Sequence, residues 1–172
     1  AFQPGAHMPE APQRPGLTVF DDWPLADLVP FIDWTPFFST WELAGRYPAI
    51  LDDAIVGVEA RKLFDDARAM LDTIVRERWL RANAVVGIWP AHRVGDDVVV
   101  QAGGPTTLHF LRQQVDKPVE RPDFCLADFI DPAGDWLGGF AVGIHGIEPH
   151  LARFKADHDD YSDILLKALA DR

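Results

Sequence analysis

The chain has 172 residues, enough for one domain with a substantial core, and 48% of them are hydrophobic. Every apolar run is shorter than the roughly 20 residues that cross a bilayer, so we predict neither a membrane span nor a membrane partner. The formal net charge of −11 would repel phosphate backbones, which argues against a nucleic-acid partner. The single cysteine, Cys125, excludes an internal disulfide.

Residues 1–16 contain four of the 14 prolines and little apolar pattern. We expect this stretch to be a linker or a cloning remnant, and the folded domain to cover residues 17–172. No stretch combines a basic start, an apolar run and a small-residue cleavage site, so we expect a cytoplasmic protein.

Two segments have the apolar spacing of a helix. From Val58 to about Trp79, apolar residues recur every three or four positions: Leu63, Phe64, Ala67, Met70, Leu71, Ile74 and Val75. A second helical pattern runs from about Pro149 to the end, with a possible interruption at residues 158–160. It reaches Arg172 without a Gly, Asn or Pro to stop it, so we expect the domain to continue beyond this residue.

Four short segments between these helices are predicted strands. Residues 84–89 form an apolar run ended by Pro90, and residues 98–100 follow a turn-forming Gly-Asp-Asp, so these two should pair. Residues 138–144 and 123–130 are the other two candidates. Because strands and helices do not alternate regularly, we predict an α+β fold, with a mainly antiparallel sheet packed against long helices in a single domain.

Catalytic signatures are missing from the sequence. It has no nucleophile elbow, no phosphate-binding loop and no dinucleotide fingerprint, so we predict neither a catalytic residue nor a metal site. Cys125 lies in an apolar run and is expected to be a buried structural thiol. From the residues alone, a small-molecule-binding domain is favoured over an enzyme.

The acid most suggestive of a binding site is Asp33, which lies among apolar and aromatic residues in IDWTPFF. An unpaired buried charge is costly, so Asp33 should have a partner. It could cap a helix that starts near Thr35, which is the commoner role, or it could accept hydrogen bonds from the ammonium group of a ligand.

Three other polar stretches have a structural and a functional interpretation. Residues 158–161, His-Asp-Asp-Tyr, could bind a metal, but the acids more often favour a helix N-terminus. Residues 91–97 are expected to form a solvated turn. Residues 108–114 look like a helix start, in which Arg112 is either an internal ion-pair partner or a ligand clamp.

Six stretches in order resemble the activation domain of cobalamin-dependent methionine synthase. They are IDWTPFFSTWELAGRYP (32–48), VGVEARKLFDDARAMLD (56–72), VVGIWPAHRVGDDV (85–98), LRQQ (111–114), FCLADFI (124–130) and HDDYSDILLKALADR (158–172). Together they span most of the chain from residue 17 onward, which makes the resemblance specific.

The resemblance implies a role in repairing oxidised cobalamin. In this family the domain binds S-adenosylmethionine and docks on the cobalamin-binding domain, and reductive methylation then restores the methyl cofactor. The electron comes from flavodoxin or an equivalent reductase. The chain would thus belong to a methyltransferase of methionine biosynthesis, without being catalytically competent in isolation.

The resemblance also assigns residues. Asp33 matches the acid that holds the amino group of S-adenosylmethionine, which reverses the preference for a capping role alone. Asp171 matches an acid that contacts the cobalamin domain, where it can hydrogen-bond the histidine displaced from cobalt. Glu148 matches a second contact with that histidine, within a stretch, residues 143–152, that is shorter here than in the family.

The sequence also departs from the family pattern. The next family acid on the terminal helix would lie beyond Arg172, and the later Arg-x-x-x-Gly-Tyr-Pro-type motif has no counterpart. We therefore expect the chain to hold one edge of the ligand site. The alternative is a non-catalytic interaction module that docks on a cobalamin protein without binding S-adenosylmethionine itself.

Overall fold

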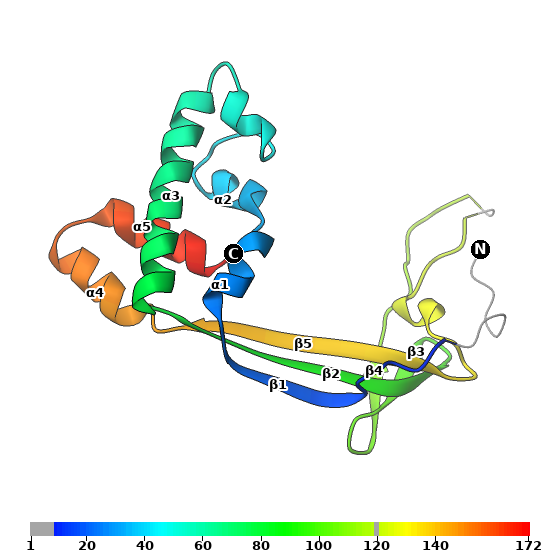
Figure 1. The fold of residues 1–172 in the computed structure, drawn as a ribbon. Coiled ribbons are helices and arrows are strands. Elements are labelled where there is room, and N and C mark those ends of the chain that lie inside the picture. Colours follow the sequence, from blue (N-terminus) through cyan, green and yellow to red (C-terminus); the bar gives the residue numbers. More distant parts are fainter. Residues whose placement is uncertain (1–8, 119–120) are drawn as a thin grey trace. The chain divides into compact units, whose positions relative to one another are not determined.

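The computed structural model describes residues 9–118 and 121–172 (Figure 1). Within these residues the elements are β1 Gly16–Trp23, α1 Leu25–Leu28, η1 Val29–Phe31, α2 Trp34–Thr40, η2 Ala49–Asp52, α3 Gly57–Glu77, β2 Arg81–Val94, β3 Asp97–Gln101, β4 Pro105–His109, η3 Leu126–Phe129, β5 Asp135–His145, α4 Glu148–Ala156 and α5 Asp160–Ala170, where η marks a 3-10 helix.

The chain divides into two compact units, which we describe separately. Among the described residues, the sheet unit comprises residues 9–19, 85–118 and 121–141, and the helical unit comprises residues 20–84 and 142–172. Strands β1, β2 and β5 each contribute residues to both units.

The sheet has the order β1-β2-β3-β4, and β5 also pairs with β2. β2 and β3 are antiparallel, with Val94 opposite Asp97 and Ala91 opposite Val100. Gly95 in the intervening turn has a φ of 64°, a conformation that favours glycine. Strand β4 is antiparallel to β3. These pairings confirm the predicted α+β fold with a mainly antiparallel sheet.

A small core lies in the sheet unit. Val98 and Val100, two residues apart on β3, are both buried, as the alternation of a strand requires. They pack with Ala91, Ala127 and Cys125. The predicted burial of the Cys125 thiol is therefore confirmed.

The larger core lies in the helical unit. α3 buries Ala60, Leu63, Ala67 and Ile74, which recur at helical spacing on one face. Phe37 and Phe38 of α2 and the leucines of α5 also belong to this core. The long helix predicted from Val58 to about Trp79 is thus confirmed; it ends at Glu77, and the C-cap residue Arg78 has a φ of 53°.

The second predicted helix is interrupted, as expected. α4 ends at Ala156 and α5 begins at Asp160. The Oδ1 atom of Asp159 accepts a hydrogen bond from the main-chain N–H of Ser162 at 3.0 Å, which caps α5. The structural interpretation of this acidic stretch is therefore confirmed.

Four other predictions were wrong. Residues 91–97 are not a solvated turn as a whole, since residues 91–94 belong to β2 and Ala91 is buried. β2 does not end at Pro90 but continues to Val94, because residues 91–94 pair with β3. Residues 123–130 are not a strand. They contain η3, in which the Asp128 carboxylate accepts from the main-chain N–H of Cys125 at 2.9 Å. Residues 108–114 do not start a helix, since Leu108 and His109 end β4.

None of the helices in the described part of the chain is both long and apolar enough to cross a membrane.

Candidate functional site

Asp33 lies immediately before α2 in the helical unit. Its Oδ1 atom accepts a hydrogen bond from the main-chain N–H of Thr35 at 3.1 Å, so Asp33 is the N-cap of this helix. The residue is exposed, and Oδ2 has no hydrogen-bond partner among the residues that the structure describes. The capping role is confirmed, and one carboxylate oxygen remains available to a ligand.

A cluster of aromatic rings holds α2 against α3. Trp34 meets Phe64 of α3 edge-on, with ring centroids 4.8 Å apart, and Tyr47 lies 5.4 Å from the same Phe64 ring. Phe37 and Phe38 are fully buried below them. Such packing fixes the direction in which α2 starts and hence the place of Asp33.

Asp171 is the C-cap residue of α5, and 74% of its side chain is exposed. It forms an ion pair with Arg172 at 2.9 Å, and Arg172 also donates to Oγ1 of Thr40 at 3.2 Å. Since Thr40 is the last residue of α2, the end of α5 lies beside the end of α2.

Asp33 and Asp171 are therefore near opposite ends of α2. A helix of seven residues is about 10 Å long, so the two carboxylates do not form one polar cluster. Both belong to the helical unit, and both are exposed. They can face a ligand or a partner at two separate points.

Glu148 is the first residue of α4 and is exposed. An acid in the first turn favours a helix through the backbone dipole, so this position has a structural explanation. Two residues later, His150 stacks on Trp79 with centroids 4.2 Å apart. Burial, followed by the charge of Arg153, lowers the pKa of the His150 imidazole.

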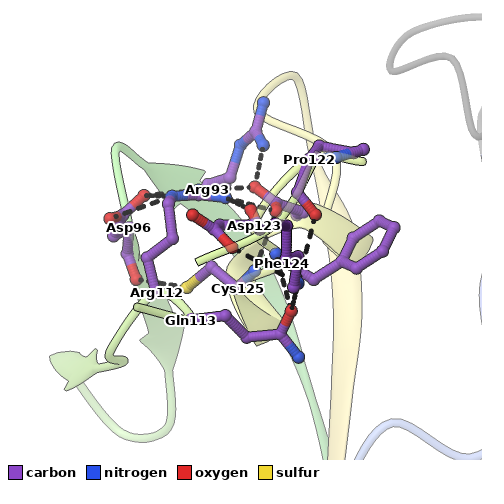
Figure 2. A network of polar contacts seen from close by, with 10 residues as sticks. Arg93, Asp96, Arg112, Gln113, Pro122, Asp123, Phe124 and Cys125 are labelled. Carbon is purple, nitrogen blue, oxygen red and sulfur yellow. Dashed lines mark hydrogen bonds and ion pairs between the residues drawn. The ribbon is translucent and has the colours of Figure 1, made fainter. Parts of the chain in front are cut away.

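The densest polar network lies in the sheet unit and centres on Arg112 (Figure 2). Its Nη1 and Nη2 donate to the two carboxylate oxygens of Asp128 at 2.7 and 2.8 Å, and Nη2 also donates to Asp96 at 2.6 Å. Nη1 further donates to the main-chain oxygen of Asp123 at 2.7 Å. Arg93 adds a second cation 3.2 Å from Asp128.

These contacts decide the role of Arg112. The hydrogen bonds from Arg112 and from the Cys125 N–H hold the pKa of the Asp128 carboxyl well below its usual range. The same pairing, first with Asp128 and then with Asp96, raises the pKa of Arg112. The guanidinium is fully engaged within the unit, so the ion-pair interpretation is confirmed over the ligand clamp.

Sequence reasoning missed the acids that pair with Arg112. Asp96 and Asp128 each lie 16 residues from it along the chain, so no local spacing links the three. Among the described residues, no three His, Cys, Asp or Glu side chains come together in a group that could hold a metal ion.

Comparison with known proteins identifies the family. The model of the family described as "Vitamin B12 dependent methionine synthase, activation domain" matches residues 24–172. The chain belongs to this family. The predicted resemblance is thereby confirmed over most of the chain.

A solved structure extends this match to the whole chain. It is described as the crystal structure of the MetH reactivation domain bound to AdoHcy. The two proteins share 43% sequence identity with a TM-score of 0.91, and the alignment covers 100% of this chain. It covers 55% of the other chain, so the present chain spans about half the length of that relative.

Proposed function

We propose that this chain is part of the reactivation module of a cobalamin-dependent methionine synthase, a cytoplasmic methyltransferase. In this role it contributes to binding S-adenosylmethionine and docks on the cobalamin-binding domain during reductive methylation of oxidised cobalamin. The observation that supports the proposal most directly is the match, over the whole of this chain, to a 43% identical reactivation domain bound to AdoHcy, S-adenosylhomocysteine.

Asp33 is the proposed contact with the ligand's amino group. Its Oδ1 is held by the helix cap, while Oδ2 is exposed and accepts no hydrogen bond from the described residues. An ammonium group donating to Oδ2 would form a charge-assisted hydrogen bond, which is about twice as strong as a neutral one. The geometry of the helical unit is therefore compatible with binding an amino acid moiety at this point.

The cobalamin partner is proposed to meet Asp171, with Glu148 as a second contact. Both acids are exposed, and Asp171 projects from the end of α5 beyond the core-facing leucines. Cobalamin, held by the neighbouring domain, would supply the metal centre that accepts the methyl group. The residues of this chain would position the methyl donor and the docked domain, while flavodoxin or an equivalent reductase supplies the electron.

A second candidate is a docking module that does not bind S-adenosylmethionine itself. The coverage of 55% of the AdoHcy-bound relative favours it, because part of that relative's binding site could lie outside the aligned half. We therefore propose that these 172 residues are not catalytically competent alone and that their ligand site is completed by further residues.

Titration calorimetry with S-adenosylmethionine tests these proposals. We expect weak or undetectable binding by the 172-residue chain and clear binding by a complete module, in which this chain is joined to the remainder of the reactivation domain. Tight binding by the 172-residue chain would refute the incomplete site. A complete module without affinity would favour the docking module.

Asp33→Asn in the complete module tests how much the charge of the Asp33 carboxylate contributes to ligand binding. Asparagine is also a good N-cap, so the helix start is retained while the charge is lost. We expect binding to weaken by about 1.5–3 kcal/mol, the range for a hydrogen bond to a charged group. Asp53→Asn is the matched control, because Asp53 similarly accepts from the N–H groups of Ile55 and Val56. An unchanged affinity in Asp33→Asn would leave Asp33 with its capping role only.

A further inference from the structure

Thr35 makes three hydrogen bonds at the start of α2. Its main-chain N–H donates to Oδ1 of Asp33 at 3.1 Å, and its side-chain Oγ1 accepts from the main-chain N–H of Tyr47 at 3.2 Å. Its carbonyl oxygen accepts from Oγ of Ser39 at 3.2 Å. Thr35 thus links the Asp33 carboxylate to a segment twelve residues further along the chain.

The segment that Thr35 holds is itself anchored at both ends. Leu43 donates its N–H to the carbonyl of Phe38 at 3.1 Å, and at the other end Ile50 is buried in the core of the helical unit. The hydrogen bond from Tyr47 to Thr35 lies between these two anchors. It is the polar contact that ties the middle of residues 43–50 to the first turn of α2.

The same contact places an aromatic ring beside the residue that follows Asp33. Tyr47 lies 6.5 Å from Trp34 and 5.4 Å from Phe64, measured between ring centroids. Trp34 is therefore enclosed by Phe64 on one side and approached by Tyr47 on another. Because Trp34 and Asp33 are adjacent, movement of Trp34 would also move the Asp33 backbone.

From these contacts we propose that Thr35 is a positioning residue for the amino group of S-adenosylmethionine, acting through Asp33. The inference rests on the proposed function of Asp33. The N–H of Thr35 restrains Oδ1 of Asp33, and the hydrogen bond from Tyr47 restrains the backbone at the start of α2. Oδ2 of Asp33 therefore points in one direction before the ligand binds. Such preorganisation lowers the entropic cost of binding.

Thr35→Val removes only the hydrogen bond that Oγ1 of Thr35 accepts from the main-chain N–H of Tyr47. Valine keeps the main-chain N–H that Asp33 accepts from and the branched shape of threonine, but it cannot accept a hydrogen bond from Tyr47. In the 172-residue chain we expect faster hydrogen exchange of the Tyr47 amide, with the exchange of core amides in α3 unchanged. Thr35→Ser, which restores an acceptor, should return the Tyr47 amide to its original rate. An unchanged exchange rate of the Tyr47 amide in Thr35→Val would show that this hydrogen bond does not hold residue 47 in place.

Ligand binding in the complete module then tests the positioning role. For S-adenosylhomocysteine, we expect Thr35→Val to lower the affinity about threefold to tenfold, as expected for one uncharged hydrogen bond, and Thr35→Ser to restore most of it. For 5′-methylthioadenosine, which lacks the amino acid moiety, the affinity should not change. Thr73→Val on α3 is the control, since the Thr73 hydroxyl bonds only near neighbours on its own helix.

A double-mutant cycle with Asp33→Asn separates the two proposals. If Thr35 acts through the Asp33 charge, Thr35→Val should have little further effect once Asp33 is asparagine. Equal losses for both ligands, or additive losses in the double variant, would make Thr35 merely structural and refute the inference. If the unaltered complete module fails to bind S-adenosylhomocysteine, the proposed function itself is wrong.

Discussion

Asp128 accepts hydrogen bonds from Arg112 and from the main chain of Cys125, with Arg93 as a further cation nearby. The contact with Arg112 is the main reason that the pKa of Asp128 is lowered in the folded chain. In the unfolded chain the carboxyl should titrate near its reference value of about 3.9. The folded state is therefore stabilised above that pH, and this contribution is lost as the pH falls from about 4 toward the lower folded pKa.

Asp128→Asn tests this link between one carboxylate and acid stability. At neutral pH we expect a lower melting temperature than for the unaltered chain, because Arg112 and Arg93 lose their anionic partner. The difference should shrink as the pH falls below about 4, where the native carboxyl loses its advantage. Thermal unfolding followed by circular dichroism across this range measures both trends.

The matched control is Asp52→Asn. Asp52 also pairs with an arginine, Arg61, at 3.0 Å, but 86% of its side chain is exposed, so the pair should contribute little. A melting-temperature difference for Asp128→Asn that stays constant down to pH 2.5 would contradict the role of the Asp128 charge.

Local residue roles could be predicted from the sequence, and long-range roles could not. The caps at Asp33 and Asp159 depend on atoms within three residues, and the burial of Cys125 follows from its apolar neighbours. The network around Arg112 depends on the fold bringing separate segments together. No property of residue 112 itself indicates which acids it meets.

At the scale of elements, the indole ring of Trp89 lies close to Gly87 within β2, which makes Gly87 sensitive to substitution. Gly87 and Trp89 lie two residues apart, so both side-chain positions point to the same face of the strand. A methyl group on residue 87 would overlap the indole ring of Trp89. We expect Gly87→Ala to destabilise the chain by about 1–3 kcal/mol, the usual range for overpacking, measured by urea unfolding.

Two comparisons distinguish steric overlap between residue 87 and Trp89 from a general loss of stability on replacing a strand glycine. Gly139→Ala in β5 should be nearly neutral, since no atom lies within 4 Å of the added methyl group. Introducing Gly87→Ala into a Trp89→Leu background should cost less than in the unaltered chain, because the smaller side chain leaves room. An equal cost in both backgrounds would exclude Trp89 as the cause.

The elements that sequence patterns predicted well are those with one buried face. α3 shows this for helices, and the β2–β3 hairpin shows it for strands. β4 was missed because all five of its residues are exposed, so it carries no apolar alternation. η3 was mistaken for a strand because residues 124–130 are mostly apolar, and a short apolar run does not distinguish a strand from a helical turn.

For the whole molecule, fold class could be predicted from the mixture of helix and strand patterns. The chemistry of individual residues did not indicate the function, because the sequence has no catalytic signature and the described residues contain no group of His, Cys, Asp or Glu suited to a metal. Taken by itself, the position of Asp33 is explained by its role as the N-cap of α2. The family became clear from the order of six long motifs, and the match over residues 24–172 confirmed it.

Docking on the cobalamin domain can be tested in the complete enzyme. Asp171→Asn should shift the cobalamin absorption spectrum from the base-off toward the base-on form, if Asp171 holds the displaced histidine as proposed. Asp160→Asn, at the other end of α5, should leave the spectrum unchanged. An unaltered base-on/base-off balance in Asp171→Asn would remove the interdomain role from this residue.

The Arg112 network constrains how this family can diverge. Replacing Arg112 alone would leave Asp96 and Asp128 facing each other without the cation between them, and replacing Asp128 alone would leave two arginines, 93 and 112, without their shared anion. Replacing one of Asp96, Arg112 and Asp128 is therefore disfavoured, whereas replacing them together preserves the balance of charge. Across homologous sequences, we expect positions 96, 112 and 128 to covary, changing as a set or not at all.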